Sequence, residues 1–419
     1  MTTPTATTEP GRGGVLGLDD DALKACVNCG LCLPHCPTFR VTGEESASPR
    51  GRINAMRAVE SGGEQAGPTF VGFMEACVQC RACEAVCPSS VPFGHLMEAT
   101  RAALRHAPAT RPGAARRLVE RVGLGVIAHR AVLRVLTTVI RLVQRLPLVG
   151  RSVPLPPPGP PRGARAARRG SAPEGGPDLW LFDGCVMDAW FGATQEASRR
   201  LLEDTGATVS RPGRGSDCCG ALHLHAGRRF WAQRLARRVM RSMPGDAPVV
   251  VDSAGCGAAL KDYGHLLGTP EAERFSARVR DISEILRPDD VACRPTGRAV
   301  VLQEPCHLRH VQGLTGAWRD VLAGAYTVVD TDDDGLCCGA GGLYNVVQPD
   351  LSGQILRRKV ATIRAAVGDA AHGEPVVASA NPGCILQLRR GGLRVAHPSV
   401  LVVDALDPDR GGARRDRSQ

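Results

Sequence analysis

The stretch CVNCGLCLPHCP, from Cys26 to Pro37, contains four cysteines and then a proline. The stretch CVQCRACEAVCP, from Cys77 to Pro88, repeats this spacing with almost none of the same intervening residues. The two stretches share little besides the cysteines and the proline. The function of both stretches therefore depends on the sulfur atoms and on the turn that follows them. Thiols packed this tightly predict a metal centre.

The spacing indicates iron–sulfur clusters. A [4Fe–4S] cube needs four thiolates, and a Cys-x-x-Cys-x-x-Cys loop supplies three of them. In the bacterial arrangement with two clusters, the last cysteine of each run ligates the other cluster, because the proline turns the chain away. We therefore predict two [4Fe–4S] clusters with crossed ligands, close enough for sequential one-electron transfer. The predicted ligands are Cys26, Cys29, Cys32 and Cys87 for the first cluster and Cys77, Cys80, Cys83 and Cys36 for the second.

Structural zinc and disulfide bonds are the alternatives in a chain with 17 cysteines. Zinc also binds Cys-x-x-Cys pairs, but it would use two pairs per site and needs neither the third cysteine nor the proline. The first residues, MTTPTATTEPGRGGVLG, contain no apolar segment of a secretory signal. We therefore expect a protein of the reducing cytoplasm rather than a disulfide framework.

Positive charge is concentrated in one part of the chain. The formal net charge is +10, but residues 101–170 contain 15 Arg, no Lys and one acidic residue, which makes that segment +14. Proteins that bind bases interleave aromatic residues with basic ones, and residues 101–170 contain no Phe, Tyr or Trp. This composition argues against a zinc-stabilised nucleic-acid-binding protein, the most remote alternative, so no nucleic-acid partner is expected.

Residues 116–150 have the periodicity of an amphipathic helix. Arginines interrupt its apolar residues too often for a membrane span. Two interpretations remain: the helix packs on its own protein or a partner, or it lies in the headgroup region of an acidic membrane, attracted through its arginines. One face combines Arg130, Arg134, Thr137, Thr138, Arg141 and Arg145, and the other combines Leu133, Leu136, Val139, Ile140 and Val143.

The C-terminal half contains an internal repeat. Each copy reads strand, cysteine, helix, strand, Cys-Cys-Gly, helix, strand, cysteine, which predicts an α/β fold with a largely parallel sheet. Ligands sit at the carboxyl ends of such strands, where the single cysteines of each copy fall. The cysteines are Cys185, Cys218, Cys219 and Cys256 in the first copy and Cys306, Cys337, Cys338 and Cys384 in the second.

Each copy has enough thiols for one further cluster, or for a cluster with an exchangeable thiol. Zinc sites and buried inert cysteines are the alternatives. Four histidines, at His223, His225, His307 and His310, lie near these cysteines in sequence. They are available as ligands or proton carriers, although a hydrogen-bonded structural role is the more frequent one for a single histidine. Cys293 lies outside the repeat pattern and receives no role.

The expected fold is an α+β multidomain protein, in which a helical two-cluster ferredoxin-like N-terminal domain precedes two repeated α/β cysteine-rich domains. The predicted parts are a disordered tail (1–18), the two-cluster domain (19–108), an Arg-rich amphipathic segment (109–150), a Pro/Arg-rich linker (151–177), the first cysteine-rich domain (178–295), the second (296–408) and a tail (409–419).

With these features the chain resembles the iron–sulfur subunits of glycolate oxidase. The resemblance extends from about Cys26 to Pro398. More distant relatives with this layout serve anaerobic glycerol-3-phosphate dehydrogenase, lactate oxidation and heterodisulfide reductase. The matching stretches are CVNCGLCLPHCPTF, SPRGRI, CVQCRACEAVCPSSV, DCCGALHLH, SAGCGAALKDYG, PCHLRH and LCCGAGGLYN.

The resemblance implies an electron-transfer subunit of an oxidoreductase, located in the cytoplasm or peripherally on the inner face of the cytoplasmic membrane. It implies an FAD-containing partner that takes a hydride from glycolate, and electrons that leave toward a quinone-type acceptor. No G-x-G-x-x-G motif opens a helix after a strand, so we expect no catalytic residue here and the hydride chemistry on the flavin subunit. The equivalent subunit of a lactate or glycerol-3-phosphate dehydrogenase is the alternative.

One departure concerns the fullest form of the Cys-Cys-Gly domain, as in heterodisulfide reductase, which ends in Cys-x-x-Cys. Ala259 and Gln387 stand here where the last cysteine would be. Each copy therefore lacks one thiol, which argues against an unusual two-cube cluster and against disulfide reduction.

Overall fold

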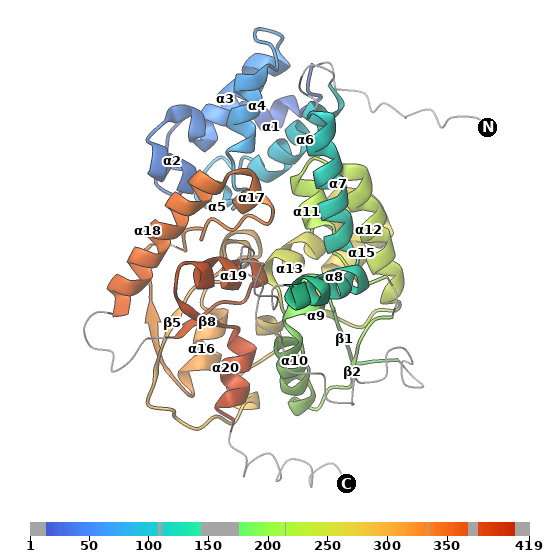
Figure 1. Cartoon of the computed structure of the whole chain (residues 1–419), viewed down its shortest axis with the longest axis vertical. Helices are drawn as coiled ribbons and strands as arrows, with labels where there is room; N and C mark the ends of the chain where they lie inside the picture. Colours follow the sequence, from blue (N-terminus) through green and yellow to red (C-terminus); the bar gives the residue numbers. More distant parts are fainter. Residues whose placement is uncertain are drawn as a thin grey trace, which may run out of the picture.

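Figure 1 shows the computed structural model of the chain, which describes residues 14–107, 110, 112–143, 176–213, 215–333, 335–367 and 376–406. The predicted N-terminal tail is described only from residue 14, the predicted linker only at residues 176 and 177, and the predicted C-terminal tail lies outside the described residues. The described parts combine helices with parallel sheets, which confirms the predicted fold class at that level.

The N-terminal domain is built from short helices whose starts are set by proline and serine. Pro37, Pro49 and Pro68 stand in the first turns of α2, α3 and α4, where the missing N–H of proline costs no helical hydrogen bond. Ser48 caps α3 by accepting a hydrogen bond from the amide of Gly51 at 3.0 Å. The helices are α1 (Asp20–Lys24), α2 (Pro37–Thr42), η1 (Glu45–Ala47), α3 (Pro49–Glu60), α4 (Pro68–Glu75), α5 (Ala82–Ala85) and α6 (Phe93–His106).

The predicted amphipathic segment forms two helices rather than one. They are α7 (Ala114–Ala128) and α8 (Arg130–Val143), and the chain turns by 107° between them. Within the described residues, no single helix combines the length and the apolar composition needed to cross a membrane, although this bent pair reaches that apolarity when its two helices are taken together.

The buried face of α8 carries an arginine and a threonine as well as Leu133, while most of its other apolar side chains are exposed. Arg130 is 7% exposed, whereas Val139 is 50% exposed. Of the two interpretations given for this segment, packing on the protein itself holds for Arg130 and Arg134, because both form ion pairs with buried aspartates of the first cysteine-rich repeat. Arg145 and the side chain of Arg141 lie outside the described residues.

The two cysteine-rich repeats contain parallel sheets of the same strand order. Sheet one runs β2-β1-β3-β4 and sheet two runs β6-β5-β7-β8, so each copy places its first strand between its second and third. All neighbouring strands are parallel, with Trp180 opposite Val249 in the first sheet and Val300 opposite Val376 in the second. The strands are β1 (Leu179–Leu181), β2 (Val209–Ser210), β3 (Val249–Val251), β4 (Val279–Asp281), β5 (Ala299–Leu302), β6 (Thr327–Asp330), β7 (Val376–Ala378) and β8 (Arg394–Ala396).

Helices cover both sheets and connect their strands. In the first repeat they are α9 (Val186–Trp190), α10 (Gly192–Asp204), α11 (Ala221–His225), α12 (Arg229–Ser242), α13 (Ala254–Lys261), α14 (Tyr263–Leu267) and α15 (Pro270–Ala277), followed by the short turns η2 (Ile282–Glu284) and η3 (Pro288–Asp290). In the second repeat they are η4 (His307–Val311), α16 (Ala317–Ala323), α17 (Tyr344–Val347), α18 (Pro349–Val367), α19 (Pro382–Arg390) and α20 (Pro398–Asp404).

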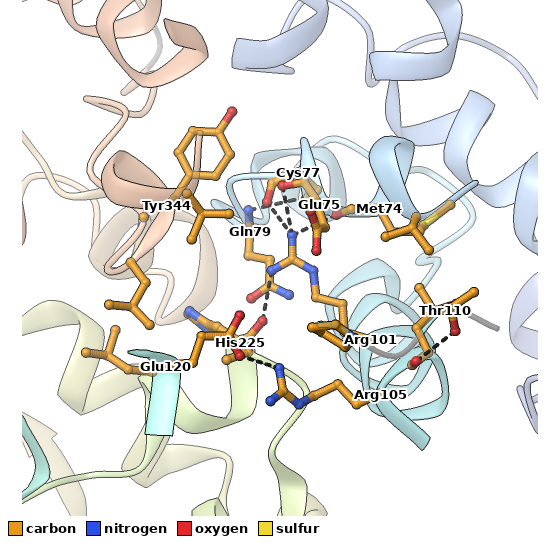
Figure 2. Close-up of a pocket in the computed structure, with 18 residues that line it drawn as sticks. Met74, Glu75, Cys77, Gln79, Arg101, Arg105, Thr110, Glu120, His225 and Tyr344 are labelled. Carbon is orange, nitrogen blue, oxygen red and sulfur yellow. Dashed lines mark hydrogen bonds and ion pairs between the residues drawn. The ribbon is translucent and has the colours of Figure 1, made fainter. Parts of the chain in front are cut away.

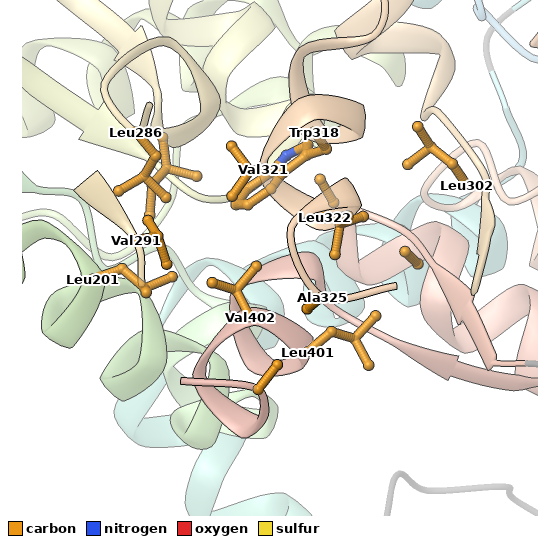
Figure 3. Packing of buried hydrophobic residues seen from close by; sticks show 14 of the residues in the cluster. Leu201, Leu286, Val291, Leu302, Trp318, Val321, Leu322, Ala325, Leu401 and Val402 are labelled. Carbon is orange, nitrogen blue, oxygen red and sulfur yellow. The ribbon is translucent and has the colours of Figure 1, made fainter. Parts of the chain in front are cut away.

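The two repeats share one hydrophobic core. Figure 3 shows Leu201 of α10, in the first repeat, near Val402 of α20, in the second, and Trp318 of α16 belongs to the same buried cluster. Both Leu201 and Val402 are 0% exposed. The boundary predicted between residues 295 and 296 thus separates two sequence repeats, but the apolar packing continues across it.

We predict that Leu201→Ala destabilises both repeats together. Deleting a fully buried leucine side chain removes apolar contacts and leaves a cavity, which costs about 2–5 kcal/mol of unfolding free energy. Hydrogen exchange followed by mass spectrometry should show faster exchange in both sheets, whereas Val346→Ala, at a side chain that is 73% exposed, should change neither. Faster exchange confined to the first sheet would contradict a shared core.

Candidate functional site

The second cysteine motif and the last cysteine of the first motif line one cavity. Cys36, Cys77, Cys80 and Cys83 all face it, and each is at most 9% exposed. Burial raises the pKa of the Cys83 thiol well above its ordinary value, and the negative charges of the other three thiols raise that pKa further. The structure therefore brings Cys36, from the first motif, among the thiols of the second.

A neighbouring cavity holds the reciprocal set. Cys26, Cys29 and Cys32 line it together with Cys87, the last cysteine of the second motif. Cys83 lines this cavity as well as the one described above, so the two cavities adjoin. The site is more open than its neighbour, because Cys29 is exposed while Cys26, Cys32 and Cys87 are half-buried.

The backbone of both motifs curls in the same way. Asn28 and Gly30 in the first motif have φ values of +58° and +87°, and Gln79 and Arg81 at the equivalent positions of the second both have +59°. Non-glycine residues rarely adopt this left-handed conformation, and such strain persists where the surroundings enforce it. Here it wraps each Cys-x-x-Cys-x-x-Cys loop so that its sulfur atoms face one cavity.

Arginines that the sequence analysis did not assign stand beside both cavities. Arg50 donates a hydrogen bond to the carbonyl oxygen of Asn28 at 3.1 Å, and Arg101 donates to the carbonyl oxygen of Cys77 at 2.7 Å. Arg52 is 1% exposed and lines the second cavity. A positive charge at these positions offsets the charge of thiolates held nearby. The only sequence signal was the stretch SPRGRI, which contains Arg50 and Arg52.

The thiols of each cysteine-rich repeat also come together, beyond the ends of the strands. Neighbouring thiols of each set lie close enough to influence one another, and burial adds to the effect of a neighbouring thiol in raising the pKa of Cys219 to about 12. The sets are Cys185, Cys218, Cys219 and Cys256 in the first repeat and Cys306, Cys337, Cys338 and Cys384 in the second.

The two sets have different neighbours, which the repeat pattern did not predict. Cys306 and Cys337 share a buried cluster with Cys80 of the second motif, and the charge of Cys306 contributes to the raised pKa of Cys80, after burial. By contrast, Cys185 and Cys218 pack against the end of α7. Within the described residues, two thiols of the second repeat therefore share a buried cluster with a thiol of the N-terminal domain, and two thiols of the first repeat share one with α7.

Two of the four histidines lie between these groups. The Nδ1 atom of His307 is 3.5 Å from the sulfur of Cys306, and the rings of His225 and His307 are stacked with their centroids 5.9 Å apart. Burial lowers the pKa of His225 to about 3, and the charge of His307 lowers it further. For His223, burial lowers the pKa to about 4, and for His310 burial also lowers the pKa.

Comparisons with known proteins bear on this site. Residues 22–91 match the family described as a 4Fe-4S dicluster domain, and residues 179–261 and 300–389 each match the family described as a cysteine-rich domain. The probable glycolate oxidase iron-sulfur subunit of Bacillus subtilis is 31% identical over 93% of this chain and 95% of that protein. The glycolate oxidase iron-sulfur subunit of Escherichia coli is 30% identical over 97% of this chain and 100% of that protein.

The chain belongs to the family of glycolate oxidase iron–sulfur subunits. The resemblance stated from the motifs is thereby confirmed. A relative with another name, lactate utilization protein A of Geobacillus kaustophilus, is 28% identical but matches only 52% of this chain, against 92% of its own length.

The cavities of this iron–sulfur subunit fit the 4Fe-4S clusters that the family models indicate. Each cavity is lined by three cysteines of one motif and the last cysteine of the other, and such thiols are the donors that hold [4Fe–4S] clusters. An arginine lies near each cavity. In the part of the chain that the structure describes, no group of three or more His, Cys, Asp or Glu side chains meets the geometry of a site for a single metal ion.

The positions of the missing cysteines have different surroundings. Ala259 lines a cavity that also contains Cys219 and His307. Gln387 is 1% exposed and donates a hydrogen bond to the hydroxyl oxygen of Ser352 at 2.9 Å. The second repeat therefore uses this position for packing between α18 and α19.

A larger cavity, of about 110 Å³, lies where the N-terminal domain meets both repeats. Figure 2 shows Gln79, Arg101, His225 and Tyr344 around it. Arg101 also donates to the carbonyl oxygen of His225 at 2.9 Å, so a single guanidinium joins the second motif to the first repeat. Sequence analysis counted Arg101 only as part of the basic segment.

The N-terminal domain and the first repeat also meet through titratable side chains. Nε2 of His95 lies 3.3 Å from the carboxylate of Asp262, and the His95 and His265 rings stack at 3.6 Å between centroids. Burial raises the pKa of the Glu98 carboxyl from 4.5 to about 7, and the charge of Asp262 raises it further. Glu98 therefore takes up a proton on folding near neutral pH.

We predict that Glu98→Gln flattens the pH dependence of stability. The pKa of the Glu98 carboxyl is about 7 in the folded protein and near 4.5 in the unfolded chain. The native state therefore loses stability as the pH rises between those two values. For a half-buried group the loss amounts to about 1–3 kcal/mol. Urea unfolding at pH 5.5 and pH 8 should show the loss in the parent protein and in Glu64→Gln, an exposed control. An unchanged slope in Glu98→Gln would contradict this role.

Proposed function

We propose that this chain is the electron-transfer subunit of a glycolate-oxidising complex. The observation that carries the proposal is the pair of adjoining cavities, each lined by three cysteines of one motif and the last cysteine of the other. A [4Fe–4S] cluster, when bound, takes up and releases one electron at a time. The membership of the chain in the glycolate oxidase iron–sulfur subunit family supports glycolate as the source of those electrons.

In this proposal the chain's own residues hold and tune two clusters. Cys26, Cys29, Cys32 and Cys87 are the ligands of the first, and Cys36, Cys77, Cys80 and Cys83 are the ligands of the second. Arg50 supplies positive charge beside the first cavity, while Arg52 and Arg101 supply it beside the second. Hydrogen bonds, charge and burial around the sulfur atoms are what set the reduction potential of such centres.

The thiols of the second repeat are proposed as the next redox site toward the acceptor. The contact of Cys306 and Cys337 with Cys80 supports this order, and the thiol set is large enough for a further cluster. The equivalent set of the first repeat lies away from that contact, beside α7. We therefore assign the two repeats different roles although their sequences follow the same pattern.

The partner is proposed to be an FAD-containing subunit that accepts the hydride of glycolate as the alcohol carbon is oxidised to the carbonyl of glyoxylate. Its two electrons then pass singly through this chain to a quinone-type acceptor at the membrane. The name of the Geobacillus kaustophilus relative leaves lactate as the second candidate substrate, but that relative matches only about half of this chain, whereas the Escherichia coli relative matches almost all of it.

We predict that cysteine substitutions fall into crossed pairs. Cys29→Ser should remove the first cluster and Cys80→Ser the second, each with a loss of about four irons. If ligands cross, the EPR spectrum of reduced Cys87→Ser matches that of Cys29→Ser, and the spectrum of Cys36→Ser matches that of Cys80→Ser. An EPR spectrum of Cys36→Ser that instead matches the spectrum of Cys29→Ser would contradict the assignment. Cys293→Ser is the control and should keep both signals.

We predict that Cys80→Ser separates flavin reduction from acceptor reduction in the complex. With the flavin subunit co-purified, glycolate should still bleach the flavin absorbance, while reduction of a soluble quinone should fall by at least about tenfold because single electrons lose their path. A parent complex that reduces quinone with lactate but not with glycolate would contradict the proposed substrate.

A further inference from the structure

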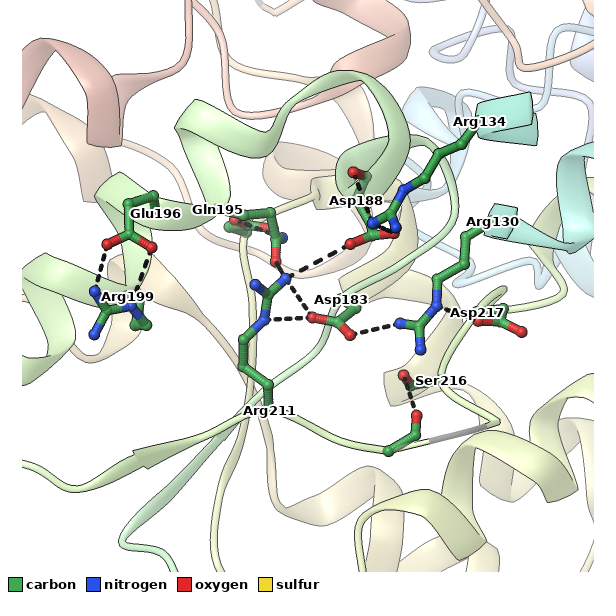
Figure 4. Close-up of polar contacts among 12 residues, drawn as sticks. Arg130, Arg134, Asp183, Asp188, Gln195, Glu196, Arg199, Arg211, Ser216 and Asp217 are labelled. Atoms are coloured by element: carbon green, nitrogen blue, oxygen red, sulfur yellow. Dashed lines mark hydrogen bonds and ion pairs between the residues drawn. The ribbon is translucent and has the colours of Figure 1, made fainter. Parts of the chain in front are cut away.

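The orientation of α8 is fixed by buried ion pairs, which Figure 4 shows. Arg130 donates a hydrogen bond to Asp183 at 2.6 Å and pairs with Asp217 at 2.8 Å, and Arg134 pairs with Asp188. The side chains of Asp183 and Asp188 are both 0% exposed. Turning the helix over would take two arginines away from these buried carboxylates, which is unfavourable even though Asp183 would keep its ion pair with Arg211.

Among the described side chains of α8, those of Arg130, Leu133 and Thr137 are buried, so most of its other apolar side chains point to solvent. Seven of the fourteen exposed large apolar side chains in the described residues lie on α7 and α8. Those of α8 recur at the spacing of a single helical stripe, which we call the apolar stripe. It consists of Val132, Val135, Leu136, Val139 and Leu142, which are 48%, 64%, 40%, 50% and 64% exposed.

An exposed stripe of this extent marks a surface that contacts a membrane or another protein. Its composition favours the membrane, since it contains only Val and Leu, whereas the centres of protein interfaces are enriched in Tyr, Trp and Arg.

The charge of the residues that follow α8 in the sequence also favours a membrane as the partner. Directly after α8, residues 144–173 contain six Arg and no Asp, Glu or Lys. Basic residues close in sequence to an apolar helical face are attracted to acidic lipid headgroups and add to the apolar contribution. The apolar side chains and the basic stretch together therefore match one partner, a bilayer that contains acidic lipids.

We propose that α8 is an interfacial helix that inserts its apolar stripe into the headgroup region of an acidic membrane. Arg130 and Arg134 act as positioning residues, because they hold the stripe outward instead of binding lipid themselves. This contact would also bring the thiols of the chain close to an acceptor in the membrane, and that consequence rests on the proposed function. The membrane contact itself does not require that function.

The test is sedimentation of the full-length protein, prepared without oxygen, with phospholipid vesicles. We expect binding to vesicles of phosphatidylglycerol mixed with phosphatidylcholine, and weaker binding to phosphatidylcholine alone. The combined variant Val135→Ser, Val139→Ser, Leu142→Ser should lower binding at least about tenfold, because it removes apolar surface from contact. All three side chains are exposed, so the variant should keep the iron content and EPR spectrum of the parent.

The matched control is Val346→Ser with Phe230→Ser, since these side chains are 73% and 63% exposed but lie elsewhere. It should bind vesicles as the parent does. A second variant, Arg165→Gln, Arg168→Gln, Arg169→Gln, should weaken binding to acidic vesicles and make it less sensitive to salt.

Unchanged vesicle binding of the stripe variant would overturn the proposal, and so would a parent protein that binds no vesicles. A stripe variant that still binds vesicles but no longer binds the flavin subunit would assign the stripe to a protein partner. That result would overturn the proposal as well. Glycolate-driven dye reduction, measured in parallel without vesicles, reports on the proposed function separately.

Discussion

The burial of thiols around shared cavities is the constraint on which the rest of this structure depends. A buried thiolate is costly, and the raised pKa of Cys83 reports that cost. A bound metal centre removes it by replacing the protons. Because Cys36 lies among the thiols of the second motif and Cys87 among those of the first, neither cavity is complete until both motifs have folded. The link between them, with α3 and its arginines, therefore belongs to the site.

The thiols of the two cysteine-rich repeats are buried against different neighbours. The repeats have the same strand order and share a core, yet the N-terminal domain contacts the thiols of the second repeat and α7 contacts those of the first. A duplicated unit has thus become asymmetric through its neighbours rather than through its own fold. In the proposed electron route, this asymmetry makes the second repeat the one that follows the clusters of the N-terminal domain.

Much of this arrangement could be predicted from the sequence where the signal was local. The cysteine spacing predicted which thiols gather at each cavity, while their role as cluster ligands stays a prediction. Alternating strands and helices predicted the parallel sheets. The orientation of α8 could not be predicted, because periodicity defines two faces but not which one is inward. That choice depends on Asp183 and Asp188, more than forty residues away in the chain. The shared core around Leu201 and the role of Arg101 likewise depend on contacts between distant segments.

The central claim is that two clusters are held by ligands exchanged between the motifs. Anomalous diffraction at the iron absorption edge, from crystals grown without oxygen, tests it most directly. The account predicts two separate iron peaks in the N-terminal domain, one surrounded by Cys26, Cys29, Cys32 and Cys87, the other by Cys36, Cys77, Cys80 and Cys83. An iron peak that has Cys36 beside Cys26, Cys29 and Cys32, or cavities that hold zinc alone, would contradict it.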